Sequence, residues 1–299
     1  MINGIINVYK EKGFTSFDVV AKLRGILKQK KIGHTGTLDP DAVGVLPVCL
    51  GNGTKLCDML TDKDKTYEAV LLLGTVTDTQ DTSGTILESK EVLNTKDEIE
   101  EAVLSFIGEY NQLPPMYSAI KVNGQKLYDL ARKGVEIDRE RRKVFIQNIE
   151  IHHIDMVKKE VTMTVDCSKG TYIRTLCHDI GIKLACGGCM KELKRTKVGQ
   201  FDINSSLTIN QIKELVDNNS ISDVVIPVDQ MFQYDKVKVL EEYCKYLNNG
   251  NQLTIDQITF ISKEYHSSAV LVYDYLERFV AIYEFIDEEK VYKPVKMFF

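Results

Sequence analysis

The sequence predicts an α/β protein of the α+β type, with a mixed, largely antiparallel central sheet followed by a small β-rich domain. Apolar and polar residues alternate between residues 149 and 167, which is typical of half-buried strands in an antiparallel sheet. Capping boxes at Thr15, Thr95 and Thr208 each precede apolar residues at helical spacing. The chain of 299 residues exceeds the usual size of one compact core, which favours one large domain and one small one.

The first predicted helix leads into a polar loop. Apolar residues at helical spacing predict an amphipathic helix over residues 16–29. The segment GHTGTLDP follows, and Pro40 favours an extended backbone at Asp39. We therefore expect a loop to present the Asp39 carboxylate. Taken alone, a surface turn in which Asp39 only caps the backbone is the commoner outcome for an Asp-Pro pair.

Buried strands and a second helix come next. Residues 45–50 form an apolar run between two glycines, which predicts a short strand that anchors the loop. Residues 69–73 predict another buried strand, entered by Tyr67. The segment TVTDTQDTSG is rich in turn residues, and helical spacing follows over residues 99–106.

The middle of the chain shows neither helical nor strand periodicity. Residues 108–143 mix Pro, Gly, Tyr, Lys and Arg without a sustained period, so we expect an insertion outside the main sheet. Aromatic residues interleaved with cations suit single-stranded RNA. An irregular loop packed around Tyr117 is the alternative.

The next predicted helix begins at a strand end. Residues 173–184 carry apolar residues at steps of three and four, so Tyr172 and Arg174 should lie at a strand-to-helix junction. From about Ile226 the pattern changes to a short helix and then two strands, SAVLVYDY and RFVAIYEF, that predict a β-hairpin. We therefore expect the small domain to begin there.

The charge is unevenly distributed. The formal net charge is -5, with +2 over residues 1–200 and -7 over residues 201–299. Three basic clusters lie in the first part: Lys28, Lys30 and Lys31; Arg139, Arg141, Arg142 and Lys143; and Lys191, Lys194, Arg195 and Lys197. Solvated faces often carry such clusters, but their closeness to candidate motifs indicates phosphate contacts.

Composition excludes several classes of protein. No apolar run approaches the roughly 20 residues that a membrane helix needs, and the first residues lack the pattern of a signal peptide, so a cytoplasmic protein without membrane contact is expected. Seven unevenly spaced cysteines fit free thiols better than a disulfide framework. Cys186 and Cys189 form a CxxC pair that lacks the further ligands of a zinc site, so we expect no metal.

A family resemblance rests on one contiguous string. Residues 33–47 read GHTGTLDPDAVGVLP, which resembles the signature of the TruB family of tRNA pseudouridine synthases. Further blocks resemble this family at residues 65–68, 114–134 and 167–201. The resemblance extends to about residue 230, and the remainder of the chain matches only loosely.

The resemblance implies a fold and an activity. It implies a pseudouridine synthase catalytic domain at residues 1–225, a thumb-like RNA-binding insertion at 108–143, and a small PUA-like domain at 226–299. The implied activity is isomerisation of the T-loop uridine at position 55 of tRNA to pseudouridine, with the T arm of tRNA as partner. We expect a monomer, although the sequence leaves the oligomeric state open. The reaction moves the ribose bond from N1 to carbon 5 of uracil without redox change. One nucleophile or base in a water-poor pocket suffices, so no cofactor is expected.

The resemblance also implies roles for single residues. Asp39 matches the catalytic carboxylate, and Arg174 matches the partner that keeps it ionised. Tyr67 matches the tyrosine that stacks on the target base, so it belongs to both the catalytic and the substrate-binding sets. Tyr172 and Leu193 match further residues of the base pocket. His34 matches the residue that stacks in the space left by the flipped uridine.

Some alternatives stay open. The family chemistry allows Asp39 to attack ribose carbon 1′, to attack uracil carbon 6 or to deprotonate the ribose. A pseudouridine synthase of another RNA, including a guide-dependent enzyme, and a non-catalytic RNA-binding or tRNA-folding protein are the other hypotheses. Lys194 stands where the family more usually has Arg, while Arg195 is retained and is expected to contact phosphate.

Overall fold

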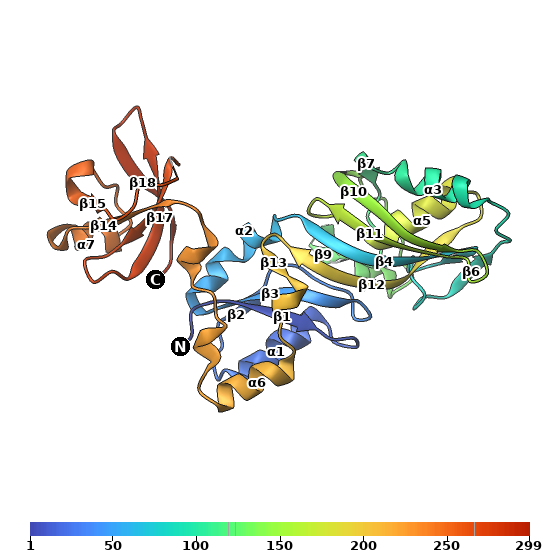
Figure 1. The fold of residues 1–299 in the computed structure, drawn as a ribbon, viewed down its shortest axis with the longest axis horizontal. Helices are drawn as coiled ribbons and strands as arrows, with labels where there is room; N and C mark the ends of the chain where they lie inside the picture. Colours follow the sequence, from blue (N-terminus) through green and yellow to red (C-terminus); the bar gives the residue numbers. More distant parts are fainter. Residues whose placement is uncertain (119, 123, 266) are drawn as a thin grey trace.

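The computed structural model describes residues 1–299 except 119, 123 and 266. A nine-stranded sheet forms the body of an elongated molecule, and a five-stranded sheet forms one end (Figure 1). None of the helices in the described part of the chain is long and apolar enough to cross a membrane.

The nine-stranded sheet is mixed and largely antiparallel, as predicted. Its order is β1-β3-β12-β4-β11-β10-β7, with β2 paired to β3 and β13 paired to β12. The strands are β1 (Gly4–Lys10), β2 (Ile32–His34), β3 (Val43–Leu50), β4 (Lys65–Leu73), β7 (Gly108–Gln112), β10 (Arg142–Asp155), β11 (Glu160–Cys167), β12 (Gly188–Val198) and β13 (Phe201–Asp202). Strands β12 and β3 pair in parallel, and there Arg195 stands beside Gly44.

The helices cover the sheet at two places. They are α1 (Ser16–Ile26), α2 (Cys57–Thr61), α3 (Lys96–Leu104), α5 (Ile173–Lys183) and α6 (Ile209–Asp217). Helices α1 and α6 pack together below β1 and β3 (Figure 1). Helix α3 packs against β10 and α5, and α5 packs against β12 and β4. All three predicted capping boxes are present. Helix α1 ends before the predicted residue 29 because Lys28 has a left-handed φ of 50°.

The predicted alternation of β11 is confirmed. Every second residue of Glu160–Cys167 is buried, and these inward side chains belong to the core beneath α3 and α5. The turn-rich segment after β4 is also more ordered than expected. It forms a small hairpin of β5 (Thr75–Thr77) and β6 (Ile86–Ser89), whose turn lies beside the start of α5.

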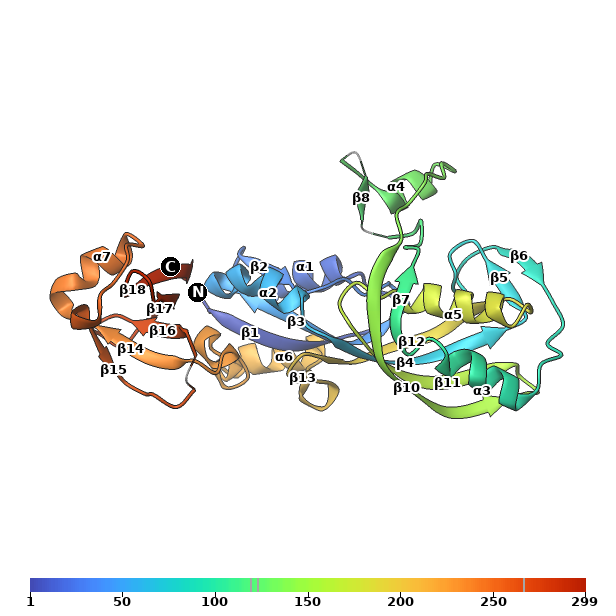
Figure 2. The same ribbon diagram turned by 90° about the horizontal axis from the view of Figure 1, so that it is seen from above.

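The insertion is shorter than the sequence indicated. Both ends of the range 108–143 are strands of the main sheet, because Gln112 of β7 pairs with Arg142 of β10. The part outside the sheet is therefore 113–141. It contains β8 (Lys121–Val122), β9 (Gln125–Lys126) and α4 (Leu127–Ala131), which stand away from the sheet (Figure 2). Ala119 and Asn123 of this insertion lie outside the described residues.

The five-stranded sheet contains the predicted C-terminal hairpin. Its order is β15-β14-β16-β17-β18, and β16 and β17 are antiparallel. The elements are β14 (Asp235–Val239), α7 (Cys244–Asn248), β15 (Ile258–Phe260), β16 (Ala269–Tyr273), β17 (Phe279–Ile286) and β18 (Val291–Met297). Leu271 and Ile282 of this sheet pack in one core with Ile5 and Val45 of the nine-stranded sheet. The two sheets are therefore joined by buried apolar contacts.

Candidate active site

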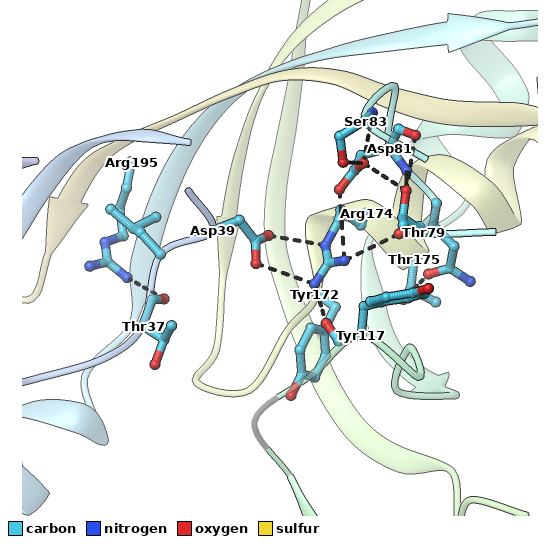
Figure 3. A network of polar contacts seen from close by, with 12 residues as sticks. Thr37, Asp39, Thr79, Asp81, Ser83, Tyr117, Tyr172, Arg174, Thr175 and Arg195 are labelled. Carbon is cyan, nitrogen blue, oxygen red and sulfur yellow. Dashed lines mark hydrogen bonds and ion pairs between the residues drawn. The ribbon is translucent and has the colours of Figure 1, made fainter. Parts of the chain in front are cut away.

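The Asp39 carboxylate faces the Arg174 guanidinium. The loop between β2 and β3 carries Asp39, and Arg174 lies in the first turn of α5. Arg174 Nε is 3.0 Å from Asp39 Oδ2, and Nη2 donates to Oδ1 at 3.3 Å (Figure 3). Two parallel bonds from a planar fork fix the orientation of a carboxylate as well as its charge.

Opposing effects act on the ionisation of Asp39. Burial of the carboxylate raises its pKa above the ordinary value of 3.8, although 36% of the side chain remains exposed. The positive charge of Arg174 lowers the pKa and is the next largest influence, while the neighbouring carboxylate of Asp81 raises it again. Asp39 is therefore a carboxylate whose charge depends on its arginine.

The remaining donors of Arg174 are also occupied. Its side chain is only 6% exposed, and Nη2 donates to the carbonyl oxygen of Tyr117 at 2.7 Å. Nη1 donates to the carbonyl oxygen of Thr79 at 3.2 Å and lies 3.7 Å from Asp81 Oδ2. The guanidinium thus binds the insertion and the β5–β6 turn as well as Asp39 (Figure 3).

Two buried cations, Lys10 and Arg195, donate hydrogen bonds to backbone carbonyl oxygens of the Asp39 loop and of β3. Lys10 Nζ donates to three carbonyl oxygens, including that of Pro40 at 3.1 Å, and burial lowers the pKa of Lys10 to about 8. Arg195 is 2% exposed and donates through Nε to the carbonyl oxygen of Val45 at 2.7 Å. The expectation that Arg195 contacts phosphate is therefore wrong, because its guanidinium points inward to loop carbonyls.

The rest of that basic cluster is largely paired. Lys191 Nζ lies 2.6 Å from a Glu160 carboxylate oxygen, and Lys194 Nζ lies 2.7 Å from one of Glu68. Lys197 is exposed. The cluster therefore offers less free positive charge than its sequence indicated.

Tyr67 and Leu193 lie on neighbouring strands. Tyr67 of β4 stands opposite Arg195 of β12, and Leu193 stands opposite Ala69. Tyr67 is 8% exposed, and its burial raises the pKa of its phenol, an effect that the charge of Arg195 opposes. Leu193 is half-buried against the same core. These side chains form an apolar wall near the Asp39 loop.

Tyr172 directly precedes the helix that carries Arg174. It is the N-cap residue of α5, and its side chain is half-buried. Burial raises the pKa of its phenol, and the charges of Arg174 and Asp39 both act on it. The structure therefore brings Asp39, Arg174, Tyr172 and Tyr67 into one neighbourhood.

His34 lies at the end of β2. Its Nδ1 accepts a hydrogen bond from the Gly36 N–H at 3.3 Å. Burial lowers the pKa of its imidazole below 6.5, and the charge of Arg195 acts in the same direction. His34 is therefore a neutral aromatic ring at neutral pH.

Packing of α5 against β12 explains the glycine at position 188 of the CxxC motif. A Cβ on Gly181 of α5 would lie 2.1 Å from the backbone nitrogen of Gly188 in β12, so helix and strand approach closely only because both residues are glycine. Cys186 and Cys189 are buried free thiols. Among the residues described, no group of three or more His, Cys, Asp or Glu side chains is placed to hold a metal ion.

Several residues of this site were missed by sequence reasoning. Asp81 lies in a segment whose residues predicted only a turn. Lys10 follows a short apolar run and belongs to no recognisable motif. Their importance comes from contacts with segments far away in the chain, which no local pattern reveals.

Comparisons with known proteins agree with this geometry. Residues 24–173 match the model of the TruB family pseudouridylate synthase N-terminal domain, and residues 174–233 match the tRNA pseudouridylate synthase B C-terminal domain. The chain is 56% identical over 306 residues to tRNA pseudouridine synthase B of Lachnoclostridium phytofermentans, covering 99% of this chain and 100% of that protein. It is 45% identical over 298 residues to the protein of the same name from Clostridium kluyveri, with 99% and 100% covered.

A solved structure gives the same picture of the fold. A chain of a Cbf5-Nop10-Gar1 complex superposes with a TM-score of 0.71 at 26% identity, covering 99% of this chain and 85% of that one. The fold is thus that of a pseudouridine synthase. The chain belongs to the TruB family, and it is an enzyme that isomerises uridine in tRNA to pseudouridine.

Proposed function

We propose that this enzyme acts on the T-loop uridine at position 55 of tRNA and that Asp39 is its catalytic carboxylate. The observation that carries the proposal is the two-point contact between Asp39 and Arg174. An ionised carboxylate is the reactive group that the isomerisation needs, and the guanidinium both favours the charge and sets the direction of its oxygens.

The chemistry needs no other reactive group. The bond between N1 of uracil and carbon 1′ of ribose breaks, the base turns, and carbon 5 bonds to carbon 1′. Carbon 5 then loses its proton, and N1 gains one. Whether Asp39 attacks carbon 1′, attacks carbon 6 or deprotonates the ribose, it must be ionised and free of bulk water.

We assign the base pocket to Tyr67, Tyr172 and Leu193. Flipping a uridine out of a folded loop costs a few kcal/mol, and stacking on one aromatic ring returns about 1–3 kcal/mol. Tyr67 would supply this stack from the wall that it shares with Leu193. His34 would stack in the space that the uridine leaves, a role that its neutral imidazole supports because a neutral ring costs less to desolvate.

We divide RNA binding unequally between the parts of the chain. The insertion at 113–141 would hold the T arm, because Arg174 bonds to its backbone at Tyr117 and so joins it to the site. Residues 226–299 would act as a PUA-like module that adds only a few contacts, because residues 201–299 carry a charge of -7. We further propose a monomer that works in the cytoplasm, where its tRNA substrate is found.

Tritium release tests this function directly. A T-arm transcript labelled at carbon 5 of its uridines should lose tritium only from position 55, with no guide RNA added. Asp39→Asn should abolish the release while retaining RNA binding. Release from other uridines of the T arm, or a requirement for a guide RNA, would overturn the substrate assignment. Tritium release by the Asn variant above about a tenth of the parent rate would overturn the role of Asp39.

A further inference from the structure

Gln112 links the base of the insertion to the start of α5. It is the last residue of β7 and only 1% exposed. Its Nε2 donates to the carbonyl oxygen of Tyr172 at 2.9 Å, and its Oε1 accepts from the Tyr172 N–H at 2.7 Å. A side-chain amide has the donor and the acceptor needed to bind both polar groups of one residue's backbone. Gln112 thus holds a residue 60 positions away as a neighbouring strand would.

The backbone that Gln112 holds sets the start of the helix. Tyr172 is the N-cap of α5, with φ -97° and ψ 108°, and its own side chain makes no capping bond. Arg174 follows two residues later and reaches Asp39 from the first turn. A shift of the Tyr172 backbone would therefore move the origin of the guanidinium that orients the carboxylate.

The insertion reaches the same guanidinium by a second route. Gln112 pairs with Arg142 where the two strands leave the sheet, so it stands at the base of the insertion. Beyond that base, the carbonyl oxygen of Tyr117 accepts from Arg174 Nη2. Gln112, at the base of the insertion, therefore contacts the backbone before Arg174, and Tyr117 of the insertion contacts the Arg174 side chain.

We propose that Gln112 is a positioning residue for isomerisation. It holds Arg174 in the position from which it binds Asp39, and it couples that position to the base of the insertion. The inference rests on the proposed roles of Asp39 and Arg174. Gln112 does not contact the reacting atoms. It acts through the Tyr172 backbone, so its loss should slow the chemical step more than it weakens tRNA binding.

The first test compares Gln112→Leu with Gln147→Leu, a matched change at an exposed glutamine of β10. Single-turnover tritium release at saturating enzyme should fall by about tenfold or more in Gln112→Leu, because a displacement of about 1 Å can cost about 100-fold. The Kd for tRNA should change by less than about threefold. Gln147→Leu should behave as the parent. An unchanged rate, or equal losses in rate and binding, would overturn the proposal.

The variant Gln112→Glu distinguishes a positioning role of the side chain from a general loss of folded structure. A protonated carboxyl can donate to the Tyr172 carbonyl and accept from its N–H, as the amide does, whereas the ionised form has no donor and repels the carbonyl. Burial raises the pKa of a carboxyl, so protonation falls in an accessible range. The ratio of variant to parent rate should therefore rise as the pH falls from 8 to 5.5. A flat ratio would contradict the proposal.

Measuring the parent at each pH removes the titration of the surrounding groups. The titratable and charged groups around Gln112 are Tyr110 with its partners Asp179 and Arg141, Arg142 and Tyr172, and beyond Tyr172 lie Arg174 and Asp39. Asp39→Asn is assayed in the same series to separate a failure of the proposed function from a failure of the positioning role of Gln112. If Asp39→Asn keeps more than about a tenth of the parent rate, the proposed catalytic role of Asp39 fails. If it is inactive while both Gln112 variants match the parent at every pH, only the positioning role fails.

Discussion

Two nitrogens of Arg174 meet the two carboxylate oxygens of Asp39, at 3.0 and 3.3 Å, across a separation of 135 positions in the chain. The contact depends on how the sheet is assembled. Asp39 belongs to the loop before β3, Arg174 belongs to α5, and β12 joins the two regions by pairing with β3 and packing against α5. The parallel contact of β12 with Gly44 is close enough that a Cβ there would lie 2.2 Å from the Arg195 carbonyl oxygen. The geometry of the site is therefore a property of the whole sheet.

Asp39→Asn should abolish turnover while leaving tRNA binding nearly intact. The amide keeps the shape of the carboxylate but lacks its charge and its basicity. Tritium release and filter binding measure the two effects separately. A residual rate above about a tenth of the parent would refute the assignment of Asp39.

Arg174→Lys should be severely impaired although it keeps the positive charge. A single ammonium cannot hold both carboxylate oxygens and the carbonyl groups of Thr79 and Tyr117 in the geometry of the planar fork. We expect a loss of at least about tenfold in kcat. Lys183→Arg, near the end of the same helix, is the control and should retain activity. Near-parent kcat in Arg174→Lys would show that the fork is dispensable.

The rate should depend on pH through the ionisation of Asp39. Burial raises the pKa of this carboxyl above 3.8, so the active ionised form should be lost as pH falls through that raised pKa. A single-turnover profile of rate against pH should show this acidic limb above pH 3.8. Asp81→Asn should move the limb to lower pH, because the Asp81 charge raises the pKa of Asp39. A shift of the limb to higher pH would contradict this electrostatic reading.

Lys10 should make stability rise with pH in the alkaline range. Its folded pKa of about 8 lies below the ordinary value of 10.5, so the unfolded chain binds more protons between these values. The desolvation cost of the ammonium is present below pH 8 and is relieved as pH rises through it. In urea unfolding, the free energy of unfolding of the parent relative to Lys10→Met should increase between pH 7.5 and 9.5, by at most about 3 kcal/mol. A constant difference would mean that Lys10 keeps an ordinary pKa.

Leu271→Ala should lower the stability of the whole chain. Leu271 is fully buried in the core that joins the two sheets, and large-to-small changes at such sites cost about 2–5 kcal/mol. Leu276→Ala, at a side chain that is 54% exposed, is the matched control. Thermal unfolding should remain a single transition at a lower Tm. Two separated transitions, with only one displaced, would show that the five-stranded sheet unfolds independently.

Sequence patterns predicted six strands, β3, β4, β10, β11, β16 and β17, but missed β12 in the interior of the nine-stranded sheet. Two irregularities in its pairing with β4, between Met190 and Glu192 and between Arg195 and Lys197, interrupt the alternation. Its charged residues also read as a surface cluster, whereas Arg195 is buried. Bulges break the apolar–polar alternation of this strand, and one of its buried side chains is charged. Such a strand has no simple local sequence signature.

The sequence by itself determined the elements whose cause is local: the capped helices, the alternating β11 and the loop that presents Asp39. It also marked Arg174, because the residues around it resemble a family block. Only the tertiary structure decided that Arg195 supports the loop from inside, that Asp81 joins the charge network and that Gln112 holds the Tyr172 backbone. The physical reason is that hydrogen bonds and ion pairs depend on distance in space, and these partners come from segments that meet only when the sheet is complete.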